Sequence, residues 1–426
     1  MKAIIYIVLF YFTFPLWANV SNEEQKLIAT IDQNTEQALS LLEKIVNINS
    51  GTDNIQGVFD VGEVLKAEFE ALGFKSEWKN PPEDMHRAGT LFLTRQGNQG
   101  KKLLLIAHLD TVFPKNSLFQ TFSREGNLAK GPGVSDDKGG IVLLLYALKA
   151  LNAQGLLDNT TITVALVGDE ENSGKPTSIS RAALKEAANG MDITLDFEPN
   201  GDANSVAIAR RGTAQWEIVS QGIEEHSSLI FKPHIGFGAI FELTRVLNEA
   251  REQLSTQQYA TFNPGVIIGG TEGQIDKTHH ASGYGKTNVI AQTARAQGDM
   301  RFISDEQKQW IQNTMLTIVA QSLVKTSSTI TFVEGMPPMP ETAENKKLLD
   351  LYSKVSTDLG YPPVSAIAPD FSGGADISYV ANITPANLSR LGPVGSGHHS
   401  VNESMDIKSF NINTKRAAVL IYRLIK

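Results

Sequence analysis

The sequence contains no cysteine among its 426 residues. Disulfide bonds, thiol catalysis and cysteine-bound structural zinc are therefore excluded in any redox compartment. A metal ion would have to be held by histidine, aspartate or glutamate. The chain also lacks a Gly-x-Ser-x-Gly pentapeptide, so nothing supports a serine hydrolase of the nucleophile-elbow type. No internal repeat and no low-complexity tract is present.

An excess of basic residues is also absent, because 38 lysines and arginines stand against 46 aspartates and glutamates, for a formal net charge of −8. Proteins that bind nucleic acid normally present a positively charged surface to the phosphate backbone. We therefore expect no nucleic-acid partner. A chain of this length is long enough for two domains.

Long apolar stretches are missing except at the start of the chain. Lys2 is followed by an almost wholly apolar run over 3–17, which the small residue Ala18 closes. This order is typical of a secretory signal peptide. The alternative is a transmembrane anchor, but the run is shorter than the ~20 residues of a spanning helix. We predict a signal peptide at 1–18, a periplasmic or secreted protein, and no stable membrane insertion after cleavage.

Helix and strand patterns alternate in the first half of the chain. Apolar residues recur at helical spacing over 24–48, 58–72 and 141–151. Short continuous apolar runs, which are typical of strands buried on both faces, occupy 103–107, 162–167 and 193–197. Strands that alternate with helices indicate an α/β fold, in which ligands bind at the carboxyl ends of the strands.

The pattern changes near residue 210, where Ala214, Trp216 and Ile218 alternate with polar residues as in a half-exposed strand. The helix–strand alternation returns after the proline-rich segment 336–340. We predict an α/β catalytic domain, with a mixed central sheet flanked by helices, that is interrupted by a smaller α+β lid domain. The predicted ranges are 19–209 and 335–426 for the catalytic domain and 210–334 for the lid.

Histidine and acidic residues stand directly after the predicted strands. His108 ends the first strand and could bind a metal through one ring nitrogen, while Asp110 holds the other. Glu170 and Glu171 follow the second strand, and Glu198 follows the third. Taken singly, each has an ordinary alternative, such as a core histidine or a solvated acidic turn. A carboxylate that leaves a buried strand, however, would be costly without a cation.

Two glycine-rich segments supply the remaining candidates. Asp136 lies in segment 131–140, just before a predicted helix, and its two oxygens could bridge two cations. The alternative is a helix N-cap with an ion pair to the neighbouring lysine. His399 follows the glycine-rich segment 392–397. The joint occurrence of all these motifs, in this order, is far more specific than any one of them.

The motifs together resemble those of the M20 metallopeptidases over nearly all of residues 24–426, and they are most similar to the carboxypeptidase branch. The resemblance implies two Zn²⁺ ions per chain, with Co²⁺ or Mn²⁺ able to substitute. The implied ligands are His108, Asp136 and Glu198 for one ion and Asp136, Glu171 and His399 for the other. Glu170 would be the general base and Asp110 would orient His108. The peptide bond after Asp136 would be cis.

The resemblance also assigns roles to three residues of the lid. His226 would donate to the oxyanion, often across the interface of a homodimer formed through the lid. Asn288 and Arg301 would bind the free carboxylate of the substrate, which suits the planar guanidinium of arginine. Without the resemblance, an exposed histidine and a strand-edge Asp–Arg pair would be the simpler interpretations. The segment Gly373-Gly374-Ala375-Asp376 matches a family turn, which we interpret as structural or as support for the site.

The implied activity is zinc-dependent hydrolysis of a peptide or amide bond, with release of a C-terminal amino acid, for which a carboxypeptidase of glutamate type is one candidate. The alternatives are an N-acyl-amino-acid deacylase or a dipeptidase with the same metal site, and a non-catalytic metal- or peptide-binding homologue in the cell envelope. The expected substrate is a small peptide or an N-acyl amino acid. Two segments depart from the family pattern: the surroundings of His226, with Glu224, Glu225 and Ser228, and the long segment 270–285, with Lys277, His279 and His280.

Overall fold

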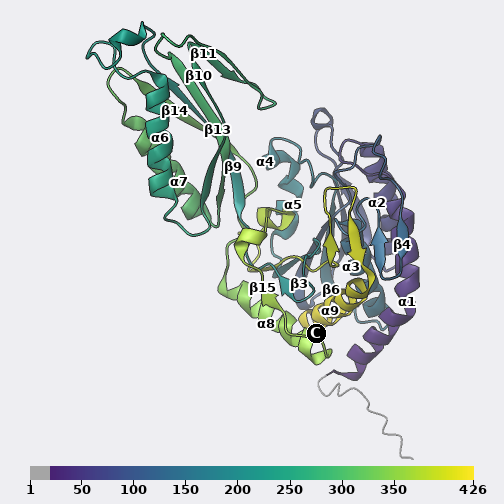
Figure 1. Ribbon diagram of the computed structural model, residues 1–426. Helices are drawn as coiled ribbons and strands as arrows, with labels where there is room; N and C mark the ends of the chain where they lie inside the picture. Colours follow the sequence, from purple (N-terminus) through teal and green to yellow (C-terminus); the bar gives the residue numbers. More distant parts are fainter. Residues whose placement is uncertain (1–19) are drawn as a thin grey trace, which may run out of the picture.

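The computed structural model describes residues 20–426, so the predicted signal peptide at 1–18 lies outside the described residues. The chain forms a larger part around a six-stranded sheet and a smaller part around a four-stranded sheet (Figure 1). Among the helices of residues 20–426, none is long and apolar enough to cross a membrane.

The larger sheet is mixed, as predicted. Its strands lie in the order β1-β2-β6-β3-β7-β16. The pairs β1–β2 and β2–β6 are antiparallel, whereas β6–β3, β3–β7 and β7–β16 are parallel. The strands are β1 (Lys75–Lys79), β2 (Thr90–Arg95), β3 (Gln99–His108), β6 (Thr160–Val167), β7 (Ile193–Asp196) and β16 (Ala386–Leu388).

Helices cover this sheet, and its central strands are buried on both faces. Leu103 and Leu105 of β3 join the core beneath α1, α3 and α9, while Leu104 and Ile106 face α5 and the segment 375–381. This two-sided burial explains why the strand is a continuous apolar run. The helices of this part are α1 (Asn22–Val46), α2 (Ile55–Glu70), α3 (Lys138–Asn152), α4 (Thr177–Ser180), α5 (Ala182–Ala188), α8 (Ala343–Asp358) and α9 (Ile407–Ile425).

The parallel strands bring the carboxyl ends of β3, β6 and β7 to one edge of the sheet. His108 is the last residue of β3. Glu170 and Glu171 follow β6, and Glu198 follows β7. The topology therefore places these four side chains at the same edge.

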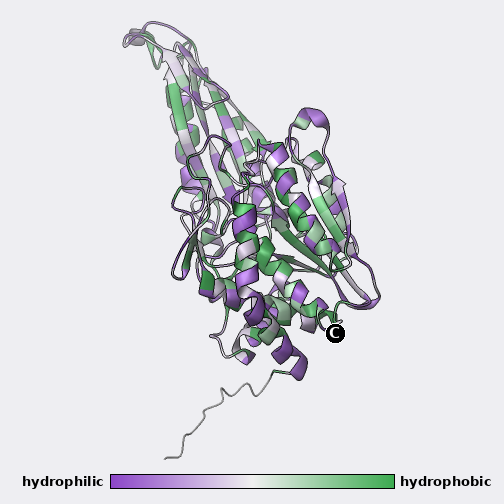
Figure 2. Ribbon diagram, turned by 90° about the vertical axis from the view of Figure 1, so that its right-hand side faces the viewer, coloured by the Kyte–Doolittle hydropathy of each residue, from purple (hydrophilic) through white to green (hydrophobic). Residues whose placement is uncertain are grey.

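The smaller part is an antiparallel sheet in the order β10-β13-β9-β14, with α6 and α7 on one face. Trp216, Met300 and Phe302 are buried in its core, where the Trp216 ring stacks on Phe262 at 4.2 Å between centroids. In Figure 2 the strands of this part alternate between hydrophilic and hydrophobic residues. We call it the lid. Its elements are β9 (Gly212–Gln221), α6 (Ala239–Leu254), β10 (Thr261–Gly270), β13 (Thr293–Phe302), α7 (Asp305–Ala320) and β14 (Ser327–Glu334).

Short strands complete the fold. The long segment 270–285 is a hairpin of β11 (Glu272–Ile275) and β12 (Ala281–Tyr284) attached to the lid. A second small sheet has the order β17-β18-β5-β4 and joins segment 395–406 to segment 123–130. Its strands are β4 (Ser123–Glu125), β5 (Leu128–Lys130), β17 (Gly395–Ser396) and β18 (Ser404–Asp406). The loop that carries His399 is thereby held against the segment that leads to Asp136.

Candidate active site

His108 is buried, and both of its ring nitrogens have carboxylate neighbours. Its Nδ1 lies 3.1 Å from the backbone oxygen of Asp110 and 3.4 Å from Asp110 Oδ1. Its Nε2 lies 3.1 Å from Asp136 Oδ1. The ring is thus held at one nitrogen and directs the other into an acidic cluster, which is the arrangement that a metal-binding histidine requires.

Asp110 organises more of the site than the sequence predicted. Its buried carboxylate accepts the backbone N–H of Glu170 on Oδ1 at 3.0 Å and that of Glu171 on Oδ2 at 3.1 Å. The hydroxyl of Thr52 donates to the same Oδ2 at 2.7 Å. Asp110 therefore fixes the two adjacent glutamates in addition to the ring of His108.

The carboxylate of Asp136 stands between two histidines. Its Oδ1 faces His108 Nε2, and its Oδ2 lies 3.3 Å from His399 Nε2. The same nitrogen of His399 is 3.1 Å from Glu171 Oε2. The peptide bond from Asp136 to Asp137 is cis, as the resemblance implies. The two oxygens of one carboxylate thus belong to two different sets of side chains.

Glu403 holds the backbone that carries Asp136. Its buried carboxylate accepts three backbone N–H groups: Ser135 at 3.0 Å and Asp136 at 3.1 Å on Oε1, and Gly133 at 3.0 Å on Oε2. The sequence did not point to Glu403, because it is a single acidic residue in a loop. Its position four residues after His399 is the only signal that could have found it.

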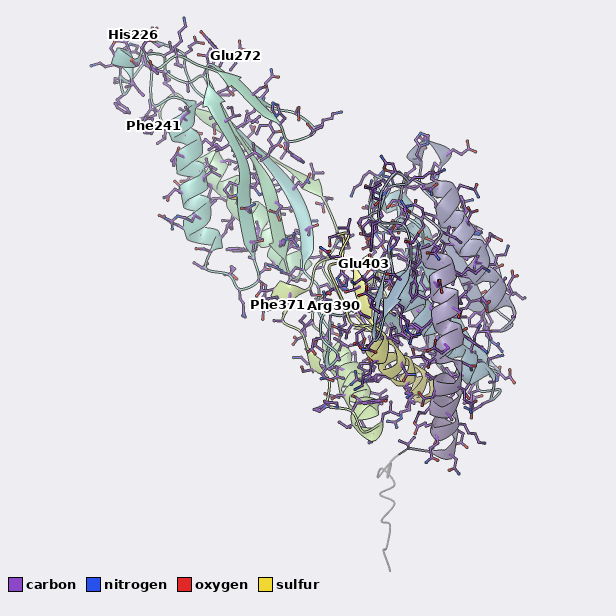
Figure 3. The ribbon with its side chains drawn as sticks, turned by 45° about the vertical axis from the view of Figure 1, so that its right-hand side comes forward. His226, Phe241, Glu272, Phe371, Arg390 and Glu403 are labelled. Carbon is purple, nitrogen blue, oxygen red and sulfur yellow. The ribbon has the colours of Figure 1, made fainter. Side chains whose placement is uncertain are left out.

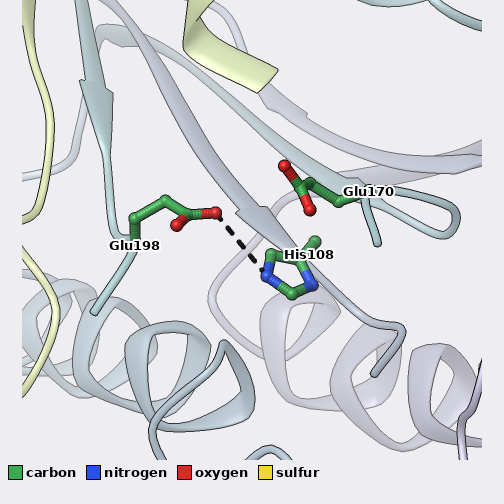
Figure 4. Close-up of side chains that lie close together, drawn as sticks. All are labelled: His108, Glu170 and Glu198. Atoms are coloured by element: carbon green, nitrogen blue, oxygen red, sulfur yellow. Dashed lines mark ion pairs between the residues drawn. The ribbon is translucent and has the colours of Figure 1, made fainter. Parts of the chain in front are cut away.

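Glu198 and Glu170 face His108 from neighbouring strands (Figure 4). Glu198 Oε1 lies 3.6 Å from His108 Nε2. Helix α3 can begin close to the end of β7 because position 140 is glycine. A Cβ at Gly140 would lie only 2.2 Å from the backbone oxygen of Phe197.

The side chains of the cluster fit divalent cations. Two sets have donor atoms within 4.8 Å of one another, namely His108 with Glu170 and Glu198, and His108 with Asp136 and Glu171. Imidazole nitrogens and carboxylate oxygens are ligands that zinc accepts, and cobalt and manganese can bind such sites too. Buried carboxylates gathered in so small a volume would be costly without positive charge between them.

The charges of the cluster shift the pKa values of its members. Burial, together with the negative charge of Glu198, raises the pKa of Glu170 well above its usual range. Hydrogen bonds to Asp136 and Glu171 raise the pKa of His399 to about 10. Both shifts describe a site with surplus negative charge, which would attract cations.

Arg181 lies behind the loop that carries the two glutamates. Its fully buried guanidinium donates to Asp169 Oδ1 and to Asp376 Oδ1, both at 2.6 Å. It also donates to the backbone oxygen of Asp169 and to Ser173 Oγ, both at 2.9 Å. Arg181 therefore ties the loop to the turn that contains Asp376. The sequence singled out the turn but not Arg181, which resembles an ordinary helix arginine.

The three lid candidates do not lie together. The backbone oxygen of Asn288 accepts a hydrogen bond from the N–H of Ser227 at 2.9 Å, which places Asn288 beside His226. Figure 3 shows His226 at the end of the lid farthest from the catalytic part. Arg301 lies toward the opposite end of β13 and contacts Asp299 at 3.3 Å. Within one chain, His226 and Asn288 are thus separated from the acidic cluster.

Residues 104–423 match the model of Peptidase family M20/M25/M40. Carboxypeptidase G2 of Pseudomonas sp. (strain RS-16) is 28% identical over 394 residues, which cover 91% of this chain and 89% of that protein. A succinyl-diaminopimelate desuccinylase of Cupriavidus necator is 25% identical over 386 residues, which cover 87% of this chain and 94% of the relative.

Solved structures show the same fold. The aminopeptidase PepT of Bacillus cereus superposes with a TM-score of 0.73 at 17% identity, covering 92% of this chain and 99% of that one. The YXEP protein of Bacillus subtilis, a dinuclear metal binding peptidase, has a TM-score of 0.64 at 13% identity, with coverage of 92% and 99%. The chain belongs to peptidase family M20/M25/M40 and is a metal-dependent hydrolase of the peptidase and amidohydrolase type.

Proposed function

We propose that this chain is a two-zinc carboxypeptidase, which hydrolyses a peptide or amide bond and releases the C-terminal amino acid. The observation that carries the proposal is the position of Asp136. Its two carboxylate oxygens face different partners, His108 at 3.1 Å and His399 at 3.3 Å. A carboxylate divided in this way can bridge two cations, and a two-metal centre is suited to amide hydrolysis.

The proposed ligands are His108, Asp136 and Glu198 for one zinc and Asp136, Glu171 and His399 for the other. When bound, the two cations would supply Lewis acidity and lower the pKa of a water molecule toward ~7. Asp110 contributes by holding the Nδ1 side of His108, which leaves Nε2 for the metal.

Glu170 is the proposed general base. Its carboxylate points into the cluster beside His108 (Figure 4), and its backbone N–H is anchored on Asp110 at 3.0 Å. It accepts the proton of the attacking water and then donates a proton to the nitrogen of the leaving amine. Burial and the charge of Glu198 raise the pKa of Glu170, which makes its carboxylate a stronger proton acceptor than an exposed glutamate.

The lid supplies the proposed substrate contacts. Arg301 and Asn288 bind the free carboxylate, and His226 donates to the developing oxyanion. His226 and Asn288 lie far from the cluster of their own chain, so we assign them to the site of a partner chain in a lid-mediated homodimer. Exposed apolar side chains at the same end of the lid support such an interface. They are Phe241, which is labelled in Figure 3, together with Phe231, whose ring lies 5.8 Å from that of Phe241 between centroids, and Ile240.

An N-acyl-amino-acid deacylase is the second candidate. Several relatives are succinyl-diaminopimelate desuccinylases, one of them 25% identical over 87% of this chain. The metal cluster and Arg301 suit a carboxypeptidase and a deacylase equally. Both enzymes hydrolyse an amide bond, and they differ only in whether the amino acid or the acyl group beside that bond is recognised. Dipeptidase activity belongs to the same set.

We also propose that the protein is exported and that segment 1–18 is removed on the way. The apolar run after Lys2 supports this. Cell fractionation with N-terminal sequencing of the mature protein is the test. A cytoplasmic protein that keeps Met1 or Lys2 would contradict export.

Hydrolysis by the purified full chain tests the proposal. The substrates are blocked dipeptides, N-acyl amino acids and free dipeptides, with release of the amino acid measured. We expect activity to disappear in a chelator and to return with zinc. Faster release from blocked dipeptides than from acetylated amino acids favours the carboxypeptidase, and the reverse favours the deacylase. Activity that survives complete metal removal would overturn both.

A further inference from the structure

Arg390 has a backbone conformation that non-glycine residues seldom adopt. It follows β16 with a φ of 67°, in the left-handed region. Its backbone oxygen accepts a hydrogen bond from Asn200 Nδ2 at 3.3 Å. Two residues later, the N–H of Gly392 donates to the backbone oxygen of Glu198 at 3.0 Å. This segment therefore runs beside a proposed metal ligand, and it carries arginine where glycine would fit with less strain.

A second arginine, Arg210, holds the residue that precedes Arg390. Arg210 is buried and donates from Nε to Ser389 Oγ at 2.9 Å and from Nη1 to the backbone oxygen of Gly373, also at 2.9 Å. Ser389 and Gly373 are thereby joined through one rigid guanidinium. Figure 3 shows Arg390 and Phe371, whose side chain is 72% exposed, where the catalytic part meets the lid.

The carboxylates near Arg390 already have other partners. Asp196 accepts the hydroxyl of Ser389 and lies 3.7 Å from Arg210 Nη2. Glu198 lies 3.6 Å from His108 and 3.8 Å from Arg210 Nη2. The guanidinium of Arg390 makes no hydrogen bond or ion pair with any residue in the range 20–426. It is a half-buried cation without a fixed partner.

The charges around Arg390 act on its guanidinium in opposite directions. Burial lowers the pKa of Arg390, the charge of Arg210 lowers it further, and the carboxylates of Glu198 and Asp136 act in the opposite direction. Two divalent cations in the cluster would balance the charge of its carboxylates. The positive charge of Arg390 would then remain unbalanced near Glu198 and Asp136, where a carboxylate of the substrate could neutralise it.

From this arrangement we infer that Arg390 binds a second carboxylate of the substrate, in addition to the carboxylate assigned to Arg301. The inference rests on the proposed function and specifies its substrates as dicarboxylic compounds. A guanidinium binds a carboxylate through two parallel hydrogen bonds, which an uncharged amide cannot match. The second carboxylate belongs either to the side chain of the released amino acid or to the acyl group.

Matched substrates separate these two sources. The first pair is N-acetyl-glutamate and N-acetyl-glutamine, and the second is N-succinyl-alanine and its succinamoyl analogue. In Arg390→Gln we expect kcat/KM to fall about tenfold or more, mainly through KM, for the carboxylate member of one pair. Its amide partner should change less than about twofold. Arg390→Lys should keep part of the preference, because it keeps the charge but not the fork.

Controls distinguish a recognition role from a structural one. Arg124→Gln alters an exposed arginine that pairs with Glu36 and should leave all four substrates unchanged. Bound zinc should be the same in wild type and in Arg390→Gln. An equal loss for both members of each pair, a loss of zinc, or no loss at all would overturn the role of Arg390.

If the wild-type protein hydrolyses none of these substrates, that result counts against the proposed function but not against the role of Arg390. A binding measurement then tests the role of Arg390 by itself. Calorimetry on the zinc-loaded protein compares glutarate, a dicarboxylate, with glutaramate, its monoamide. We expect wild type to prefer glutarate and Arg390→Gln to lose that preference. An equal preference in both proteins would contradict the role of Arg390.

Discussion

At the scale of single residues, the site depends on groups that hold the backbone of the proposed ligands in place. In the proposed metal site, Asp136 has to present two oxygens in two directions, and a flexible loop would not hold them there. Glu403 supplies the rigidity, because three backbone N–H groups of the loop converge on its carboxylate. Such support commonly changes metal affinity as strongly as some of the ligands do.

Replacing Glu403 should therefore weaken metal binding. Glu403→Gln keeps one acceptor oxygen but turns an amide N–H₂ either toward the N–H of Gly133 or toward the N–H groups of Ser135 and Asp136. We expect zinc affinity to fall roughly tenfold to a hundredfold, measured by competition with a chelating dye. Glu344→Gln, on the exposed face of α8, is the matched control. Unchanged affinity in Glu403→Gln would show that the loop holds its shape without this carboxylate.

At the scale of elements, a buried ion cluster joins the loop after β6 to the turn at 376. Arg181 lies between the carboxylates of Asp169 and Asp376, and all three side chains are almost completely buried. Removing the arginine would leave two buried carboxylates facing each other. We expect Arg181→Met to lower the free energy of unfolding by about 3–5 kcal/mol, measured by urea denaturation. A loss below about 1 kcal/mol would mean that water enters and replaces the guanidinium.

The lid has its own buried carboxylate. Glu242 on α6 accepts from the N–H of Leu323 and the hydroxyls of Thr326 and Ser328, at 2.9–3.0 Å, and also pairs with Arg245. Burial opposes its ionisation, but the bonds from Arg245 and the loop outweigh burial, so the pKa of Glu242 lies below its usual value of 4.5. Its stabilising effect is therefore present above pH 4.5 and is lost as the pH falls through the lowered pKa.

Glu242→Gln should destabilise the lid in a pH-dependent way. At neutral pH we expect a loss of about 2 kcal/mol, because hydrogen bonds to a charged acceptor are replaced by weaker ones. The difference in Tm between wild type and variant should shrink as the pH is lowered from about 5 to about 3. Calorimetry across that range measures it. A difference that stays constant would show that the charge of Glu242 contributes nothing.

The strands of the catalytic part could be predicted from the sequence more readily than the single residues that support the site. The apolar runs at 103–107, 162–167 and 193–197 became β3, β6 and β7, because a strand buried on both faces leaves a continuous apolar pattern. Parallel pairing then placed the residues after those strands at one edge. Glu403 and Arg390 could not be found in this way, since single charged residues in loops carry no periodicity and their partners are distant in sequence.

At the scale of the whole molecule, the lid separates the proposed catalytic groups. His226 and Asn288 are near each other but lie at the far end of the lid (Figure 3), so one chain alone does not bring them to its own cluster. The resemblance to the family assigns roles to these two residues, and those roles remain predictions. In the proposed homodimer, their placement at a metal cluster would depend on how two chains assemble, which no local pattern encodes.

Mixing two inactive variants tests this assembly. Glu170→Gln lacks the proposed base and His226→Ala lacks the proposed oxyanion donor, so each alone should be inactive. In a mixed dimer, the chain with intact Glu170 receives His226 from its partner. Equal mixing and reassembly should therefore restore about a quarter of wild-type activity, since half of the dimers are mixed and each has one intact site. No restoration, with mixed dimers present, would mean that His226 acts within its own chain.

A charge at the exposed apolar end of the lid should abolish both the proposed dimer and its activity. Phe241→Glu places a charge in the proposed interface, and we expect a monomer by analytical ultracentrifugation, with activity lost together with the dimer. Val333→Glu, which alters an exposed apolar residue at the opposite end of the lid, is the control and should remain a dimer. A fully active Phe241→Glu monomer would contradict a shared site.

The central claim is that the adjacent glutamates have different roles, with Glu170 as base and Glu171 as ligand. The most direct measurement is turnover by Glu170→Gln at known zinc content, with Glu171→Gln beside it. We predict that Glu170→Gln retains about two zinc ions per chain while kcat falls roughly a hundredfold to ten-thousandfold. Glu171→Gln should instead lose zinc. Wild-type turnover by the fully zinc-loaded Glu170→Gln variant would contradict the account.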